Sequence, residues 1–273
     1  MGFPNLALLK LSQWHKEKGD EIIWNFPLLS KQCSHTYISG VFSWSGYPYD
    51  YDGVLLGGLR FDKVGTLPDS VEHNCPDYST LDYSIGFLSR GCIRNCDFCI
   101  VQEKEGWIRP HSKPTEFIRH NKAVLLDNNW LASPRWEQDW EWLYKNKIKC
   151  DFNQGLDVRL VDRQVAERLA KLRWIRFIRF ACDSQGMKGP VSRAVQSLRS
   201  CGYSGEIFVY SIIMDDIEDA LDRIEFLRHN NCDPFAQPFR DESGDIKEDA
   251  RRFARWVNHK AIFKTVKWQD YHG

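Results

Sequence analysis

The sequence predicts an α/β fold built around a parallel sheet. From Tyr83 onward, short apolar runs rich in β-branched and aromatic residues alternate with helix-like segments of about ten to fifteen residues. Six such strand–helix units follow one another, and parallel strands joined by helices imply right-handed crossovers. With 273 residues, of which 42% are hydrophobic, the chain can bury one large core and carry a smaller N-terminal region.

The N-terminal region predicts one helix and three short strands. The helix is expected over residues 5–18, with Leu8, Leu11 and His15 at helical spacing and Gly19 as a stop signal. The strands are expected at residues 21–26, 35–45 and 51–62. This order is compatible with a fragment of an open, Rossmann-like α/β sheet. The glycine pair in the third strand permits either close approach to a ligand or a tight turn.

The core is expected to begin near residue 81, after a connector with two prolines at residues 63–82. Its strands are expected at residues 83–89, 122–127, 148–154, 174–183, 206–214 and 232–239. Its helices are expected at residues 113–121, 133–146, 161–172, 190–201, 217–230 and 247–260. Ser133 and Asp162 are candidate N-caps, and Gly202 closes the fourth helix. The tail after residue 260 is expected to pack over the core.

Composition narrows the class of protein. Lys plus Arg equals Asp plus Glu at 37 each, so bulk charge does not indicate a nucleic-acid partner, and a local basic patch remains open. No apolar run approaches the roughly 18 residues of a membrane span, so no membrane partner is expected. Six of the nine cysteines are scattered singly and suggest no disulfide framework. Cytoplasmic localisation, a reducing compartment, is therefore the expectation.

Cys92, Cys96 and Cys99 form a C-x3-C-x2-C triplet directly after the first core strand. Three thiolates in one loop can hold three irons of a [4Fe–4S] cluster and leave the fourth iron without a protein ligand. A position left open in this way admits a substrate or cofactor, as in catalytic metal sites. Chance proximity and zinc are the alternatives, but zinc sites usually pair this kind of knuckle with a second one, and no second knuckle follows.

The segment CIRNCDFC resembles the signature of the radical S-adenosylmethionine enzymes, in its spacing, its aromatic residue before the last Cys and the strand that precedes it. The resemblance implies a partial (β/α)6 barrel core, which agrees with the six units counted above. It implies that S-adenosylmethionine binds the open iron and is cleaved to methionine and a 5′-deoxyadenosyl radical. That radical would abstract hydrogen from an unidentified substrate. An electron donor such as flavodoxin or ferredoxin is the implied partner.

Residues 1–80 resemble the cobalamin-binding-type domain that precedes the core in one branch of these enzymes. The matching segments include KGDEI after the helix, ISGVFSWS and GGLRFD. Two departures stand out: the chain starts at the helix rather than at a strand, and the motif D-x-H-x-x-G is missing. We therefore expect a truncated α/β domain with its connector at 1–80, without cobalamin, and a radical S-adenosylmethionine core at 81–273.

The resemblance also points to residues that follow the cluster and the core strands. Phe98 is expected to shield the cluster and lie near the adenine, as the matching aromatic does in the family. Asp127 is expected by position to face the methionine amino group, because this sequence has DNN where the family often has a GGE-like motif; a loop cap is the alternative. Asn153 and Gln154 can bind the ribose or the carboxylate.

Three further candidates follow later in the core. Arg159 can pair bidentately with the cofactor carboxylate, or locally with Asp157. Ser184 or Asp183, after the fourth strand, is expected to contact cofactor or substrate. Gln237, in the sixth strand, is expected to touch the adenine or the substrate.

The reaction subclass is less constrained. Methylthiotransferases hold a second cluster on three N-terminal cysteines, whereas only Cys33 and Cys75 precede the triplet, and no later cysteine block follows. We therefore expect a single cluster. A small molecule, a peptide and a modified nucleotide all remain open as substrates. The alternative function is a non-catalytic iron–sulfur redox or regulatory binding protein that retains the cluster without turnover.

Overall fold

The computed structural model describes residues 4–24, 29, 32–40, 54–57, 66–241 and 243–273. Its core is mixed α/β with two parallel sheets. The first has the order β3-β6-β7-β8, formed by Ser84–Gly86, Lys122–Leu125, Lys149–Phe152 and Arg173–Trp174. The second has the order β11-β10-β9, formed by Asp233–Pro238, Ile207–Ile213 and Ile178–Ala181. All five strand pairings in these two sheets are parallel, as the sequence predicts.

Every expected core strand is present, and the fourth is divided into β8 and β9. Backbone hydrogen bonds connect both pieces to the chain around β7. The amide of Ile175 donates to the carbonyl of Cys150 at 2.9 Å, and the amide of Leu156 donates to the carbonyl of Arg179 at 2.8 Å. The chain therefore passes from the first sheet to the second within residues 173–181.

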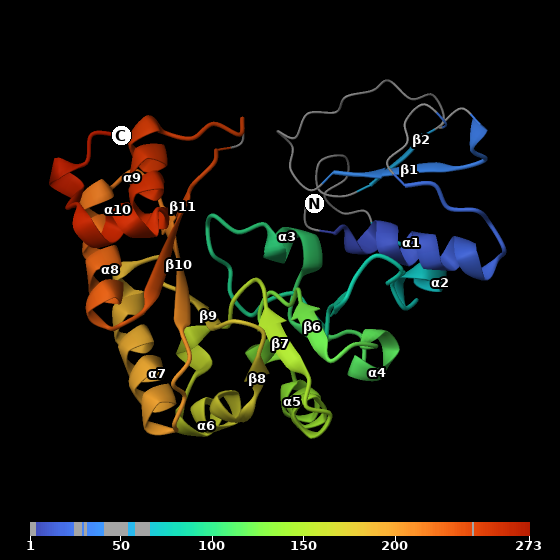
Figure 1. Cartoon of the computed structure of the whole chain (residues 1–273), viewed down its shortest axis with the longest axis horizontal. Helices are drawn as coiled ribbons and strands as arrows, with labels where there is room; N and C mark the ends of the chain where they lie inside the picture. The colour runs from blue at the N-terminus through green and yellow to red at the C-terminus, as the bar shows by residue number, and fades with distance from the viewer. Residues whose placement is uncertain (1–3, 25–28, 30–31, 41–53, 58–65, 242) are drawn as a thin grey trace.

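The longer helices follow their strands and occupy the ranges Trp136–Lys145 (α5), Arg163–Lys171 (α6), Lys188–Ser200 (α7), Ile217–His229 (α8) and Glu248–Asn258 (α9). Figure 1 shows α7 and α8 running beside β10. The Asp162 carboxylate accepts from the amide of Val165 at 2.8 Å, and Gly202 has φ +87°, so both expected helix ends are confirmed. The expected start at Ser133 is wrong: this residue ends a 3-10 turn, and α5 begins three residues later.

Four short elements around the cysteines differ from the expectation. The helix expected at 113–121 shortens to α4, Pro114–Phe117, because Ile118 is extended with φ −81° and ψ 115°. A short helix, α3, spans Val101–Glu105. An antiparallel pair joins β4, Ser89–Arg90, to β5, Arg109–Pro110. Neither α3 nor this pair has the length to produce a periodic sequence signal.

Helix α1, Leu6–Glu17, packs against the first sheet. Alternating residues of β6 face opposite ways: Ala123 and Leu125 belong to the large core under the helices, whereas Val124 joins Ile85 and Leu9 in a second cluster. Of the residues expected to form the apolar face, His15 is buried, whereas Leu8 and Leu11 are only half-buried. In Figure 1, α1 lies on the opposite side of the molecule from α8, α9 and α10.

The rest of the N-terminal region is partly described. β1, Thr36–Ser39, pairs in parallel with β2, Val54–Gly57, and a short helix, α2, spans Asp69–Glu72 in the expected connector. Residues 21–24, 35 and 40 form no strand, and residues 25–26, 41–45, 51–53 and 58–62 of the three predicted strands lie outside the described residues. Within the described ranges, no helix combines the length and apolar character needed to cross a membrane.

The C-terminal tail packs over the core as expected. Helix α10, Lys260–Thr265, buries Phe263, and Trp268 and Tyr271 contact the large core from its edge. No seventh strand follows it in the described residues.

Candidate functional site

The cysteine loop, residues 91–106, leaves the sheet after β4 and returns through α3. Two hydrogen bonds close it: the amide of Cys92 donates to the carbonyl of Gly106 at 3.2 Å, and the amide of Gly91 donates to the Glu105 carboxylate at 2.8 Å. Gly91 has φ +83°, and a Cβ atom there would collide with the carbonyl oxygen of Trp107. Only glycine therefore fits where the loop starts.

The three cysteines of this loop are all free thiols. Cys92 and Cys96 are half-buried and Cys99 is exposed, and the amide of Cys99 donates to the carbonyl of Cys96 at 2.9 Å. Burial raises the pKa of Cys96 and of Cys99, and the charge of the neighbouring thiols raises it further. The thiols thus lie close enough to interact electrostatically. Positive charge from a bound metal would reduce the repulsion between their thiolate forms.

Residues from two neighbouring strand ends hold the loop. Asp157, just after β7, accepts from Arg94 Nε at 2.8 Å and from Arg159 Nε at 2.7 Å. Asn129, after β6, donates from Nδ2 to Asp157 Oδ2 at 3.3 Å and to Cys92 Sγ at 3.3 Å. Burial alone would raise the pKa of Asp157, but the two arginines outweigh it and lower the pKa. A buried carboxylate therefore joins the cysteine loop to the sheet through charge-assisted hydrogen bonds.

Asp183 follows β9 at the carboxyl end of the second sheet. Its carboxylate accepts from the amide of Ile212 at 2.8 Å, and burial raises its pKa. Electrostatic coupling links Asp183 to Cys96, Cys99 and Arg159. Strand ends of both sheets thus converge on the cysteine loop, as in parallel α/β folds, where functional groups collect at the carboxyl ends of strands.

The structure places Asp127 behind this loop. The side chain is fully buried, and its oxygens accept from the amides of Leu88 and Ser89 and from the Ser89 hydroxyl. Burial raises its pKa to about 7. Asp127 therefore connects the chain before the cysteines to the end of β6. These hydrogen bonds are those of a loop cap, which the sequence left as the alternative to a contact with the methionine amino group.

The other expected contact residues lie at the strand ends with different exposures. Asn153 is half-buried, and its carbonyl accepts from the Tyr210 hydroxyl at 3.1 Å. Phe98 is 39% exposed at the edge of the loop. Gln154, Ser184 and Gln237 are exposed at the ends of β7, β9 and β11. Arg159 bonds Asp157, which is the local pair that the sequence left as one option.

One buried atom at this site has no partner in the structure. Asn129 is 1% exposed, and its Oδ1 accepts no hydrogen bond, which costs free energy unless a bound group supplies a donor. Among the described residues, no three His, Cys, Asp or Glu side chains converge as ligands of a single ion would. In an iron–sulfur cluster each thiolate binds a different iron, so its sulfurs need not converge on one point. The three soft thiolates of the loop fit such a group.

Sequence reasoning did not select Asn129, Arg94 or Glu105 as site residues. The run DNN after β6 includes Asn129, but the sequence analysis selected Asp127 from it. The asparagine two places later reaches the thiol. Spacing alone does not distinguish these two, because residues two apart in an extended segment point to the same side.

Comparisons with known proteins add little. No family model matches the chain, and no curated protein matches it. Among solved structures, methylornithine synthase (PylB) aligns with a TM-score of 0.43 and 14% identity over 68% of this chain. The chain spans 65% of the length of that structure. At this TM-score only part of the two backbones superimposes, so the resemblance says nothing about the activity of this chain.

Proposed function

We propose that this protein is a radical S-adenosylmethionine enzyme with a single [4Fe–4S] cluster on Cys92, Cys96 and Cys99. The observation that carries the proposal is the placement of three free thiols in one closed loop at the carboxyl ends of parallel strands. When bound, such a cluster supplies the electron that cleaves S-adenosylmethionine to methionine and a 5′-deoxyadenosyl radical. The sequence signature CIRNCDFC, which contains these three cysteines, supports the same function.

The two sheets are proposed to act as one partial (β/α)6 barrel, with residues 1–80 as a smaller α/β region packed on it. The continuous run from β8 to β9 and the hydrogen bonds that join it to β7 support this arrangement. In an open barrel, the cysteine loop and the ends of all six strands share one rim. Helix α1 would then cover part of the inner face, because Leu9 packs on Ile85 and Val124.

The residues of the chain would bind and orient the cofactor at this rim. Arg159 keeps a fixed position through Asp157 and carries the positive charge that a cofactor carboxylate requires. The exposed amides and hydroxyl of Gln154, Ser184 and Gln237, with the amide of Asn153, supply hydrogen bonds for the ribose and adenine. Phe98 would stack on the adenine, and a flavodoxin or ferredoxin would deliver electrons.

The decisive experiment is anaerobic reconstitution of the full chain with iron and sulfide, reduction with dithionite, and addition of S-adenosylmethionine. We expect 5′-deoxyadenosine by mass spectrometry and a visible cluster absorbance. The Cys96→Ala variant is expected to lose both, whereas Cys201→Ala, which removes a thiol from the end of α7, is expected to keep both.

Two other outcomes separate the alternatives. An intact cluster without 5′-deoxyadenosine would reject the enzyme and favour the non-catalytic iron–sulfur protein. Zinc in place of iron after anaerobic purification, with no cluster absorbance on reconstitution, would reject both the enzyme and the non-catalytic iron–sulfur protein.

A further inference from the structure

Asn129 occupies an unusual position for an amide side chain. It is almost fully buried at the end of β6, and its single Nδ2 group donates to both Cys92 Sγ and Asp157 Oδ2. Both N–H groups of the amide are therefore used, one for a sulfur and one for a carboxylate.

The chemistry of these partners fixes the orientation of the amide. Exchanging Nδ2 and Oδ1 would place the amide oxygen against the Asp157 carboxylate, which accepts hydrogen bonds and does not donate them when ionised. Asp157 stays ionised because Arg94 and Arg159 lower its pKa. The N–H groups must therefore face Cys92 and Asp157.

Asp157 in turn cannot move freely. Arg94 binds it from within the cysteine loop, and Arg159 binds it from the same turn through both its backbone amide and Nε. A buried carboxylate with these three donors is a rigid anchor, so the amide that it orients is held in one geometry beside the sulfur.

We propose that Asn129 is a positioning residue for the first cluster ligand: its amide holds the Cys92 sulfur through an N–H···S hydrogen bond and raises the reduction potential of the cluster. This inference rests on the proposed function, because it requires a cluster on Cys92. Hydrogen bonds to the sulfurs are among the factors that set iron–sulfur potentials, and they favour the reduced form because it carries more negative charge.

The test is an EPR-monitored redox titration of the reconstituted full-length protein and of Asn129→Leu. The variant keeps the three cysteines and a similar volume, and we expect it to load iron while its midpoint potential shifts to a more negative value. The matched control is Asn128→Leu: this neighbouring amide donates to Glu105 at 2.9 Å rather than to a sulfur, so its potential should equal that of the wild type. Equal potentials in wild type and Asn129→Leu, or equal shifts in both variants, overturn the proposal.

A second measurement covers the case in which Asn129→Leu does not fold or bind iron. The wild-type chain is labelled with 15N at asparagine side-chain amides only, and the reduced cluster is examined by pulsed EPR. We expect a 15N coupling that survives in Asn95→Ala, which removes the exposed asparagine of the loop. Its absence from the wild type, or its loss in Asn95→Ala, overturns the proposal. A wild-type chain that assembles no cluster overturns the proposed function, and this inference with it.

Discussion

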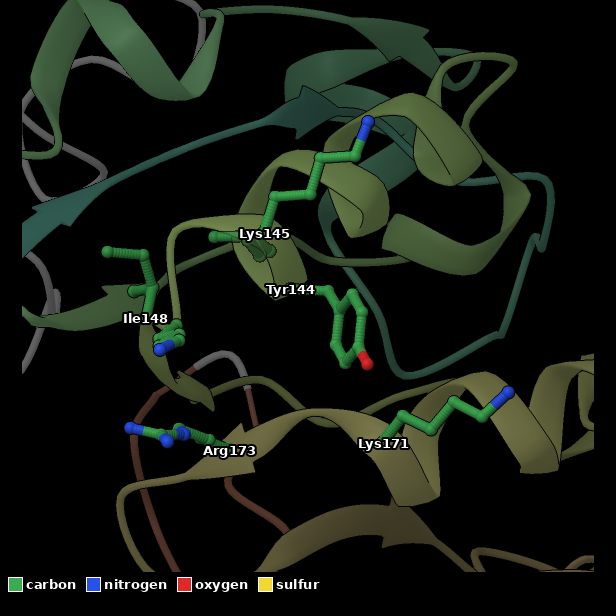
Figure 2. Close-up of a pocket in the computed structure, with 7 residues that line it drawn as sticks. Tyr144, Lys145, Ile148, Lys171 and Arg173 are labelled. Atoms are coloured by element: carbon green, nitrogen blue, oxygen red, sulfur yellow. The ribbon is translucent and has the colours of Figure 1, made fainter.

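The charged side chains at the two ends of the parallel strands differ in their burial and in how far apart in the sequence their partners lie. At the carboxyl ends, the side chain of Asp157 is 5% exposed and binds Arg94, a residue 63 positions away in the sequence. At the amino ends, a cavity of ≈ 280 Å³ opens between the last turns of α5 and α6. Figure 2 shows the residues around this cavity, among them Tyr144, Lys145, Ile148, Lys171 and Arg173.

The basic residues at the amino ends form local pairs. Lys145 bonds Glu141 and Lys171 bonds Glu167, each four residues earlier on the same helix, and all four side chains are exposed. In Figure 2 the charged ends of Lys145, Lys171 and Arg173 point in different directions. Exposed pairs of this kind contribute little to stability and do not converge on a ligand. A hollow surface therefore does not mark the proposed site here, whereas an ion pair between segments far apart in the sequence does.

The largest effect is expected from Gly91→Ala in the cysteine loop. The change combines a left-handed φ with a collision against the carbonyl of Trp107, so it should lower the free energy of unfolding by about 3 kcal/mol. Gly202→Ala is the control, because it has nearly the same φ of +87° but open space around it, and should cost about 1 kcal/mol. Urea unfolding of the cluster-free protein measures both; equal losses would mean that the loop adjusts to the added methyl group.

The next effect is a pH dependence at Asp127. The pKa of this carboxyl is raised by burial to about 7 in the folded protein, above its ordinary value of 3.8, so folding favours the protonated form. The corresponding stability is fully present below about pH 4 and is lost as the pH rises through 7.

Asp127→Asn removes this titration and should reduce the loss of stability between pH 5 and pH 8 by about 2 kcal/mol relative to the wild type. Urea unfolding of both proteins at the two pH values measures it. Parallel pH profiles would show that Asp127 is ionised throughout this range.

An effect of similar size directly compares the two ends of the strands. Asp157→Ala leaves Arg94 and Arg159 without their shared carboxylate and should lower the free energy of unfolding by about 2 kcal/mol. Glu167→Ala removes an exposed pair with Lys171 and should change it by less than about 0.5 kcal/mol. If both variants lose the same free energy of unfolding, the ion pairs of Asp157 contribute no more to stability than an exposed surface pair.

The smallest effect is expected at the cavity itself. A double change, Lys145→Ala with Arg173→Ala, should leave iron loading and 5′-deoxyadenosine formation within about two-fold of the wild type, because neither side chain is near the cysteine loop. A larger loss in the assay of the reconstituted protein would give the amino end a role that its geometry does not suggest.

Much of the fold was predictable because its signals are local. Strand and helix periodicity located the six core strands, and the caps at Asp162 and Gly202 depend on hydrogen bonds and backbone angles within one turn. The helix start predicted at Ser133 is wrong because the chain first completes a 3-10 turn that buries Trp130 and Leu131. There the burial of two large side chains outweighed a local preference.

By itself, the sequence determined the parallel α/β class and the C-x3-C-x2-C triplet, since both depend on neighbours along the chain. Only the tertiary structure decided that Asp127 lies behind the cysteine loop while Asn129 reaches Cys92, and that Asp157 joins this loop to the sheet. Those contacts join residues 37 to 63 positions apart. They exist only once the strands have paired in register, because register sets which side chains of adjacent strand ends meet.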